Sequence, residues 1–316
     1  MKKKIEQEAT VEIVERGEKL QKVLAQAGFG SRRTMEEWIA GGGVSVNGEP
    51  ATLGMRVVEG DLIRTDRRTI RVGEREHDVR ILLYHKQEGE IVSRDDPEKR
   101  TTVFDKLPKL RGQKWTAIGR LDFNTSGLLI FTTSGELANR LMHPRFEVER
   151  EYAVRVQGKM SEAQMEQMLG IGIELEDGRV IFDKLLDEGG EGFNHWYRVM
   201  LKEGRNRVVR RTFEALGLTV SRLIRVRFGL INLPPRLKRG MTAELGTGEV
   251  AQVLEWVGLI GEAAVEKDDA PDTDMDVGAP SVMMKKVKNS PRLSRAPVVQ
   301  AHKQTLKFRS KTGVKR

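Results

Sequence analysis

The stretch that decides the fold is Gly119-Arg120-Leu121-Asp122-Phe123-Asn124-Thr125-Ser126-Gly127-Leu128-Leu129-Ile130-Phe131-Thr132-Thr133. Its residues Leu128 to Phe131 are four large apolar side chains in a row, which predicts a strand covered on both faces. The polar residues Asn124 to Gly127 before them indicate a tight turn. We therefore expect Asp122 in a loop or at a strand edge, where rigid neighbours can hold a carboxylate at a cleft. Most single aspartates in such places are merely solvated or cap a turn.

The complete string distinguishes Asp122 from an ordinary loop aspartate. Its pattern, G-R-L-D-x-x-[ST]-x-G-L-L, resembles the catalytic motif of the pseudouridine synthases that act on ribosomal RNA, which small- and large-subunit enzymes share. The resemblance implies that Asp122 is the catalytic nucleophile. It also places Arg120 where it could hold the phosphate of a flipped nucleotide or help to open the RNA helix.

The composition of the chain limits the classes of protein to which it can belong. The chain has 316 residues, enough for about two domains, and a net charge of +9, which favours a polyanionic partner such as nucleic acid. No apolar run approaches the ~20 residues of a membrane-spanning helix, and we expect a cytoplasmic protein. The absence of cysteine excludes disulfides, thiolate nucleophiles and cysteine-ligated zinc, and the five histidines lack metal-site spacing.

A small module is predicted over residues 18–65. Residues 20–27 have the apolar periodicity of a helix ending at Gly28, and Ser31 can cap a second helix. Residues 44–48 alternate into an Asn-Gly turn, which indicates a hairpin. The pattern resembles an S4 RNA-binding domain, which implies a basic face for the phosphates of structured RNA. The side chains on that face are Lys19, Lys22, Arg32 and Arg33.

Two later segments also match the synthase family. The alternating segment 148–156 predicts a strand, and its string E-R-E-Y-A-V implies that Tyr152 stacks on the target base and is a candidate proton acceptor. From propensity alone, Tyr152 would be an ordinary packing residue. The segment 204–211 matches G-R-N-R-x-V-R-R at the start of a predicted helix, and this match implies that Arg210 pairs with Asp122. Cations at a helix N-terminus oppose the macrodipole, so we expect an anion nearby. The remaining arginines of the segment, predicted to bind RNA, are Arg205, Arg207 and Arg211.

The domain prediction divides the chain into four parts, and several local elements follow from the same pattern. We expect a capping box from Thr133 to Glu136, and strands at 179–186 and 195–202 around a turn at Gly189–Gly192. Residues 66–78 are charged and are predicted to be a linker. From residue 285 onwards there are eleven Lys or Arg and no acid, which favours a disordered anchor for RNA. The parts are a flexible N-terminus (1–17), an S4-type domain with its linker (18–77), a catalytic domain (78–264) and a disordered acidic-then-basic tail (265–316).

The predicted fold class is α+β: an S4 module, then a synthase domain with a mainly antiparallel mixed sheet flanked by helices. By resemblance, the reaction needs no cofactor and no metal: a uridine is flipped out of its stack, its glycosidic bond breaks, and it reattaches as pseudouridine. The motif strings favour the large-subunit enzymes. We therefore expect a monomer that modifies 23S ribosomal RNA near the peptidyl transferase region during ribosome biogenesis.

Alternatives remain at this point. A non-catalytic ribosomal RNA-binding assembly factor and a synthase for small-subunit RNA are both compatible with the motifs. A glycoside hydrolase is disfavoured, because that chemistry normally needs two carboxylates and the motif region offers one. The sequence leaves open which uridine is used, whether the substrate is free RNA or an assembly intermediate, whether attack is on sugar or base, and which group is the general base.

Overall fold

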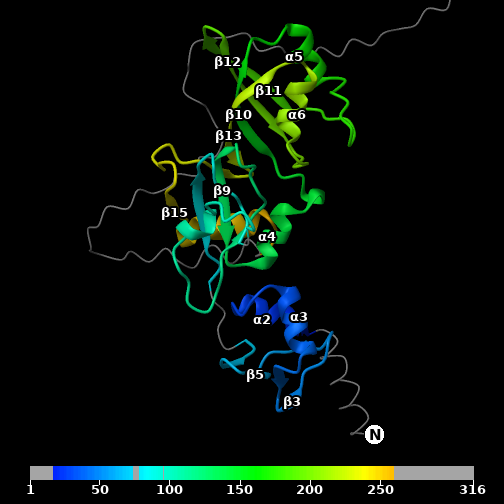
Figure 1. Ribbon diagram of the computed structural model, residues 1–316, viewed down its shortest axis with the longest axis vertical. Helices are drawn as coiled ribbons and strands as arrows, with labels where there is room; N and C mark the ends of the chain where they lie inside the picture. The colour runs from blue at the N-terminus through cyan, green and yellow to red at the C-terminus, as the bar shows by residue number, and fades with distance from the viewer. Residues whose placement is uncertain (1–16, 74–77, 95, 260–316) are drawn as a thin grey trace, which may run out of the picture. The chain divides into compact units, whose positions relative to one another are not determined.

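The computed structural model of the protein describes residues 17–73, 78–94 and 96–259 (Figure 1). The described chain groups into two compact units. The first comprises residues up to Phe146 together with those from Asn232 onwards, and the second is the continuous segment Glu147–Ile231. The first unit is therefore interrupted in sequence by the second.

The N-terminal part of the first unit is two short helices and small antiparallel sheets, as expected for an S4 module. Ser31 caps the second helix, because its Oγ accepts a hydrogen bond from Thr34 N at 3.1 Å, and Gly28 follows the first helix with φ +84°. Asn47 and Gly48 both have positive φ, as a two-residue hairpin turn requires. The elements are β1 (Glu18–Lys19), α2 (Leu20–Gln26), α3 (Arg32–Ala40), β2 (Val44–Val46), β3 (Glu49–Pro50), β4 (Arg56–Val57), β5 (Leu62–Thr65) and β6 (Thr69–Arg71).

The linker prediction for residues 66–78 is wrong at its N-terminal end. Strand β6 lies inside that range and pairs antiparallel with β5, giving a four-stranded sheet in the order β3-β2-β5-β6. Ile70 and Val72 pack against the buried core of the module. Two half-buried apolar residues among charged ones indicate a strand only weakly. The strand forms because β5 offers a partner for its backbone hydrogen bonds.

The rest of the first unit is a sheet whose central strand is the apolar run of the sequence motif. Strand β9 (Ser126–Thr132) is buried at every position, as predicted. It pairs antiparallel with β7 (Ile81–Lys86), which pairs in turn with β15 (Thr242–Glu244). The remaining elements are β8 (Thr116–Ala117), α4 (Gly135–Met142), α7 (Thr247–Trp256) and the 3₁₀ turns η1 (Val103–Lys106) and η2 (Pro144–Phe146).

The capping box predicted at Thr133 is wrong by one residue. Ser134 is the cap of α4, since its Oγ accepts from Leu137 N at 3.2 Å. The hydroxyl of Thr133 instead accepts a hydrogen bond from Arg80 N at 3.0 Å. Both residue types can cap a helix, so the sequence alone did not separate them.

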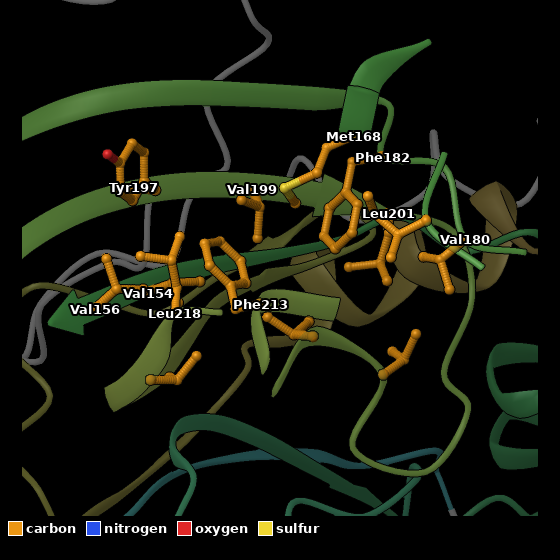
Figure 2. Close-up of a cluster of buried hydrophobic side chains, with 14 of the residues drawn as sticks. Val154, Val156, Met168, Val180, Phe182, Tyr197, Val199, Leu201, Phe213 and Leu218 are labelled. Carbon is orange, nitrogen blue, oxygen red and sulfur yellow. The ribbon is translucent and has the colours of Figure 1, made fainter. Parts of the chain in front are cut away.

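The second unit is an antiparallel sheet in the order β11-β12-β10-β13 with two helices (Figure 1). Side chains from strands β10, β12 and β13, from both helices and from the loop that holds Val180 and Phe182 form its core (Figure 2). The elements are β10 (Arg150–Gln157), α5 (Glu162–Leu169), β11 (Lys184–Glu191), β12 (Asn194–Leu201), α6 (Val208–Ala215), β13 (Thr219–Phe228) and, at the unit boundary, β14 (Ile231–Asn232).

In the hairpin of β11 and β12, β12 agrees with its prediction to within one residue, whereas β11 and the turn are displaced. Strand β11 begins at Lys184, five residues after the predicted start, and it includes Gly189 and Gly190. The pairing shifts between Asp187 and Gly189, as in a β-bulge. A side chain at Gly190 would clash with the backbone of Asn194. These glycines therefore belong to a bulged strand, and the turn lies after them.

The predictions for the N-terminal segment before residue 17 and for the tail from residue 265 lie outside the described residues. Within the residues that the structure describes, no helix has both the length and the apolar character needed to cross a membrane.

Candidate functional site

Asp122 lies half-buried in the loop between β8 and β9, where the sequence places it. The loop closes on itself, because Thr125 N donates to the Asp122 carbonyl oxygen at 3.1 Å. The Thr125 hydroxyl donates to the Asp122 carboxylate at 3.5 Å, a long bond. The carboxylate therefore projects from a backbone that is tied directly to the buried strand β9.

Lys86, the last residue of β7, anchors this loop through hydrogen bonds to its main chain. It is fully buried, and its ammonium donates to the carbonyl oxygens of Asp122 at 3.0 Å, Thr125 at 2.9 Å and Gln87 at 2.8 Å. A longer contact of 3.4 Å reaches the carbonyl of Phe123. An ammonium has three N–H groups, so these carbonyls use its full donor capacity. Lys86 thus fixes the main chain of the loop from Asp122 to Thr125.

Burial lowers the pKa of Lys86 from 10.5 to about 8, against the opposing effect of nearby carboxylates, of which Glu90 is the strongest. Glu90 is itself buried, and both its oxygens accept from the Tyr84 hydroxyl, at 2.9 and 2.8 Å. It also pairs with Lys106 at 2.5 Å and accepts from Gln87 N at 3.2 Å. Burial, and then the bond to Glu90, raise the pKa of Tyr84. Lys86, which binds the Asp122 loop, therefore lies next to a buried network of hydrogen bonds centred on Glu90.

Tyr152 lies in β10 of the second unit and packs at the margin of the buried core. Directly opposite it on β13 is Arg225, which is 3% exposed. Burial lowers the pKa of Arg225, and electrostatic attraction and hydrogen bonding to Tyr152 oppose that effect. The base-stacking candidate therefore faces a buried cation that the motif analysis did not identify.

Arg210 lies in the first half of α6, and its side chain is 6% exposed. Its Nη1 donates to the Val220 carbonyl of β13 at 3.0 Å. Val209 beside it is buried in the core of the second unit. The helix begins after Arg207, which has a left-handed φ of 47°. The turn thus brings a buried guanidinium to the face of the sheet that carries Tyr152.

Asp122 belongs to the first unit, whereas Tyr152 and Arg210 belong to the second. The structure brings Tyr152 together with Arg225, and it places Arg210 against β13. The ion pair between Asp122 and Arg210 that the motifs predict stays a prediction.

Two of the arginines predicted to bind RNA are engaged with carboxylates. Arg205 Nη1 and Arg211 Nη2 lie 3.0 and 2.8 Å from the carboxylate of Asp177. Arg205 also lies 2.5 Å from Glu203. The hydrogen bond from Arg211 is the main cause that lowers the pKa of Asp177. The anion expected near this helix start is therefore present within the chain itself.

The other predicted RNA-binding residues are more accessible. Lys22 is half-buried and forms an ion pair with Glu18, which lies four residues earlier in β1. Arg207 lies 3.6 Å from Glu214, an exposed pair. The remaining exposed side chains are Lys19, Arg32, Arg33 and Arg120. Their exposure is compatible with phosphate contacts, and their role in binding RNA stays a prediction.

Comparisons with known proteins agree with this architecture. A family model described as RNA pseudouridylate synthase matches residues 80–215, and a model of the S4 domain matches residues 18–63. The chain is 55% identical over 259 residues to ribosomal large subunit pseudouridine synthase B of Yersinia pestis, an alignment that covers 80% of this chain and 81% of that protein. It is 56% identical over 258 residues to the protein of the same name from Escherichia coli (strain K12), covering 79% and 88%.

The fold has a counterpart among solved structures. The crystal structure of a pseudouridylate synthase superposes with a TM-score of 0.51 at 24% identity, covering 75% of this chain and 99% of that one. Together with the two family models in the same chain and the extensive identity to its relatives, this agreement leads to one conclusion. The chain belongs to the family of RNA pseudouridylate synthases, with an S4 domain before the catalytic domain.

Proposed function

We propose that the protein converts one uridine of large-subunit (23S) ribosomal RNA to pseudouridine, near the peptidyl transferase region and during ribosome biogenesis. Support comes from the relatives named large-subunit synthases, which are 55–56% identical across both domains. RNA as the class of substrate also agrees with the S4 domain and the net charge of +9. We propose further that it works as a monomer in the cytoplasm, where a ribosomal RNA substrate would be met.

The proposed chemistry rearranges bonds within one nucleotide and needs no co-reactant. The target uridine leaves its stack, and Asp122 attacks it or stabilises the developing sugar cation. The bond between N1 and the sugar breaks, the uracil turns, and C5 bonds to the same sugar carbon, while any bond that Asp122 formed to the substrate breaks and restores its carboxylate. The proton on C5 then leaves to a base, and N1 ends protonated. Atoms and charge balance, because substrate and product are isomers.

Arg210 is assigned to Asp122 and Tyr152 to the base. A guanidinium beside a carboxylate favours its ionised form, which a nucleophile requires. Tyr152 stacks on the uracil, since every base offers a π-face to an aromatic ring. A neutral phenol is a poor proton acceptor, so stacking is its main assigned role.

One observation carries the proposal: the Asp122 loop is immobilised on the buried ammonium of Lys86. Catalysis through a carboxylate requires that the reacting oxygen be held in place before the substrate arrives. Contacts from this one buried cation to three carbonyls of the loop, those of Asp122, Phe123 and Thr125, supply that rigidity at the motif aspartate. A non-catalytic binding factor would not need a carboxylate that is held in place in this way.

The test is the reaction of purified protein with unmodified large-subunit ribosomal RNA, with pseudouridine mapped by chemical labelling. The variants are Asp122→Asn and, as a matched control with the same charge change, Asp66→Asn at an exposed turn of the S4 domain. We expect one new pseudouridine with wild type and with the control. Asp122→Asn should bind the RNA and make none.

Two other results would overturn parts of the proposal. Modification of small-subunit RNA instead would refute the large-subunit assignment. Binding without modification, both on free RNA and on precursor large-subunit particles, would refute the enzyme and support the assembly factor.

A further inference from the structure

Arg225 is a buried cation in a row of apolar residues. Along the face of the sheet that carries the core, β10 and β13 pair Val156 with Val220 and Val154 with Leu223. The next pair on this face is Tyr152 with Arg225. An apolar side chain at position 225 would continue the row without desolvating a charge, which is costly for a guanidinium. The position of this arginine therefore calls for a reason beyond packing.

The polypeptide is arranged to keep this guanidinium in place. The pairing of β10 with β13 shifts between Glu151 and Tyr152, so a bulge in β13 sets the register in which Arg225 faces the tyrosine. The guanidinium carbon of Arg225 lies 5.1 Å from the centre of the Phe228 ring. A cation over an aromatic face is attracted to it and has little freedom to swing away.

A second arginine stands on the same ring. The guanidinium carbon of Arg150 is also 5.1 Å from the centre of Phe228, and its Nη1 donates to the carbonyls of Val148 and Lys202, both at 2.7 Å. Each cation lowers the energy of a negative or electron-rich group nearby. Both guanidinium groups interact electrostatically with the phenol of Tyr152.

We propose that Arg225 is a positioning residue for the reaction: its guanidinium donates a hydrogen bond to the hydroxyl oxygen of Tyr152 and so fixes the plane of the ring that stacks on the uracil. The ring of a tyrosine is otherwise free to tilt about two side-chain bonds. The bond from Arg225 removes that freedom at the end of the ring farthest from the backbone. This inference rests on the role of Tyr152 proposed above, and it assigns the residue that makes the role possible.

The experiment is a double-mutant cycle on the rate of pseudouridine formation. Single-turnover rates at saturating protein are measured for wild type, Arg225→Met, Tyr152→Phe and the double variant, with RNA affinity measured separately. Tyr152→Phe keeps the aromatic face and removes the hydroxyl. We expect each single variant to slow the reaction by about 10- to 100-fold, since small misplacements of reacting groups have effects of that size. The double variant should be no slower than the slower single variant.

Other results would overturn the inference and spare the proposed function. If Tyr152→Phe reacts at the wild-type rate, or if Arg225→Met slows both backgrounds equally, Arg225 does not act through the hydroxyl. Failure of the wild type to make pseudouridine would be a failure of the proposed function itself.

Two further variants are included, one as a matched control and one as a replacement in case Arg225→Met does not fold. Arg222→Met, at a half-buried arginine of the same strand, is the matched control and should leave the rate unchanged. If Arg225→Met does not fold, Arg225→Lys replaces it: a lysine keeps the charge but lacks the planar fork, and the same cycle applies. RNA affinity should stay within about threefold of wild type in every folded variant, since the RNA is held largely by its phosphates.

Discussion

The ammonium nitrogen of Lys86 lies 3.0 Å from the main-chain carbonyl oxygen of Asp122, 36 residues further along the chain. The two residues meet because β7 and β9 are antiparallel neighbours, so the end of one strand lies beside the beginning of the other. The contact is to the backbone of Asp122, which leaves the carboxylate available. A lysine at the end of a strand thereby controls where the motif aspartate stands.

Replacing Lys86 by methionine is expected to slow pseudouridine formation at least tenfold, because the loop carbonyls lose their common donor and the carboxylate loses its fixed place. The free energy of unfolding should fall by about 2–3 kcal/mol, the cost of leaving buried carbonyls unpaired. Single-turnover kinetics and denaturant unfolding measure the two effects. Lys109→Met, at an exposed lysine of the same unit, should change neither. An unchanged rate in a destabilised Lys86→Met would contradict the positioning role.

The titration of Lys86 should act on stability and activity in opposite directions. Its pKa is lowered from 10.5 to about 8 in the folded protein, so between these values the unfolded chain holds the proton and the folded chain has released it. Rising pH therefore favours the folded state. The unfolding free energy of wild type relative to Lys86→Met should increase from pH 7.5 to 9.5.

Over the same range the reaction should slow, because a neutral amine has two N–H groups for the loop carbonyls instead of three. Lys86→Met should lack this dependence. A relative stability that falls with pH would show that the pKa of Lys86 is not lowered.

Asp177→Asn is expected to release Arg205 and Arg211 from their shared carboxylate. The pairs are exposed to solvent, so the loss of stability should be small. If these arginines serve RNA phosphates, their release should tighten binding and steepen its dependence on salt. RNA affinity measured across a salt series decides this, with Glu191→Gln, at an exposed residue, as control. Weaker binding would mean that Asp177 holds the arginines in the geometry that RNA needs.

Gly43→Ala should destabilise the S4 module. A Cβ at this position would come within 2.5 Å of Cδ1 of Trp38, whose ring packs against Phe29 with centroids 5.6 Å apart. Overpacking of this kind costs about 1–3 kcal/mol. Gly248→Ala in α7 is the matched control, since nothing lies within 4 Å of its added Cβ, and it should stabilise by about 0.4–1 kcal/mol. Thermal unfolding of both variants checks that their changes in stability have opposite signs. A Gly43→Ala variant more stable than wild type would refute the predicted clash with Trp38.

Elements with a strong local signal could be predicted from the sequence. Strand β9 is a run of large apolar residues after a polar turn, and the structure buries it throughout. The cap at Ser31 likewise depends on a residue three positions away, Thr34. Strands β6 and β15 could not be predicted in the same way. Each has three residues and forms because a partner strand presents a free edge, which for β15 is β7, about 160 residues earlier in the chain.

The residues of the candidate site likewise fall into those that could be predicted from the sequence and those that could not. Asp122, Tyr152 and Arg210 stand in strings that resemble known motifs, so the sequence predicts them as site residues. Lys86 and Arg225 were missed, because a polar residue in a strand is usually exposed. Their partners are carbonyls 36 to 39 residues away and a tyrosine on the adjacent strand. A buried cation of this kind is recognisable only once the strands are paired.

The interruption of the first unit by the second has a consequence for synthesis on the ribosome. Strand β15 closes the free edge of β7, and Glu244 makes a two-pronged pair with Arg80 at 2.5 and 2.7 Å, 164 residues apart in the chain. A nascent chain that ends before residue 242 thus leaves that edge uncovered, while Glu147–Ile231 is continuous and can fold as soon as it emerges. The inserted unit is therefore expected to fold first and the enclosing unit last, so that the Asp122 loop reaches its final rigidity only near the end of translation.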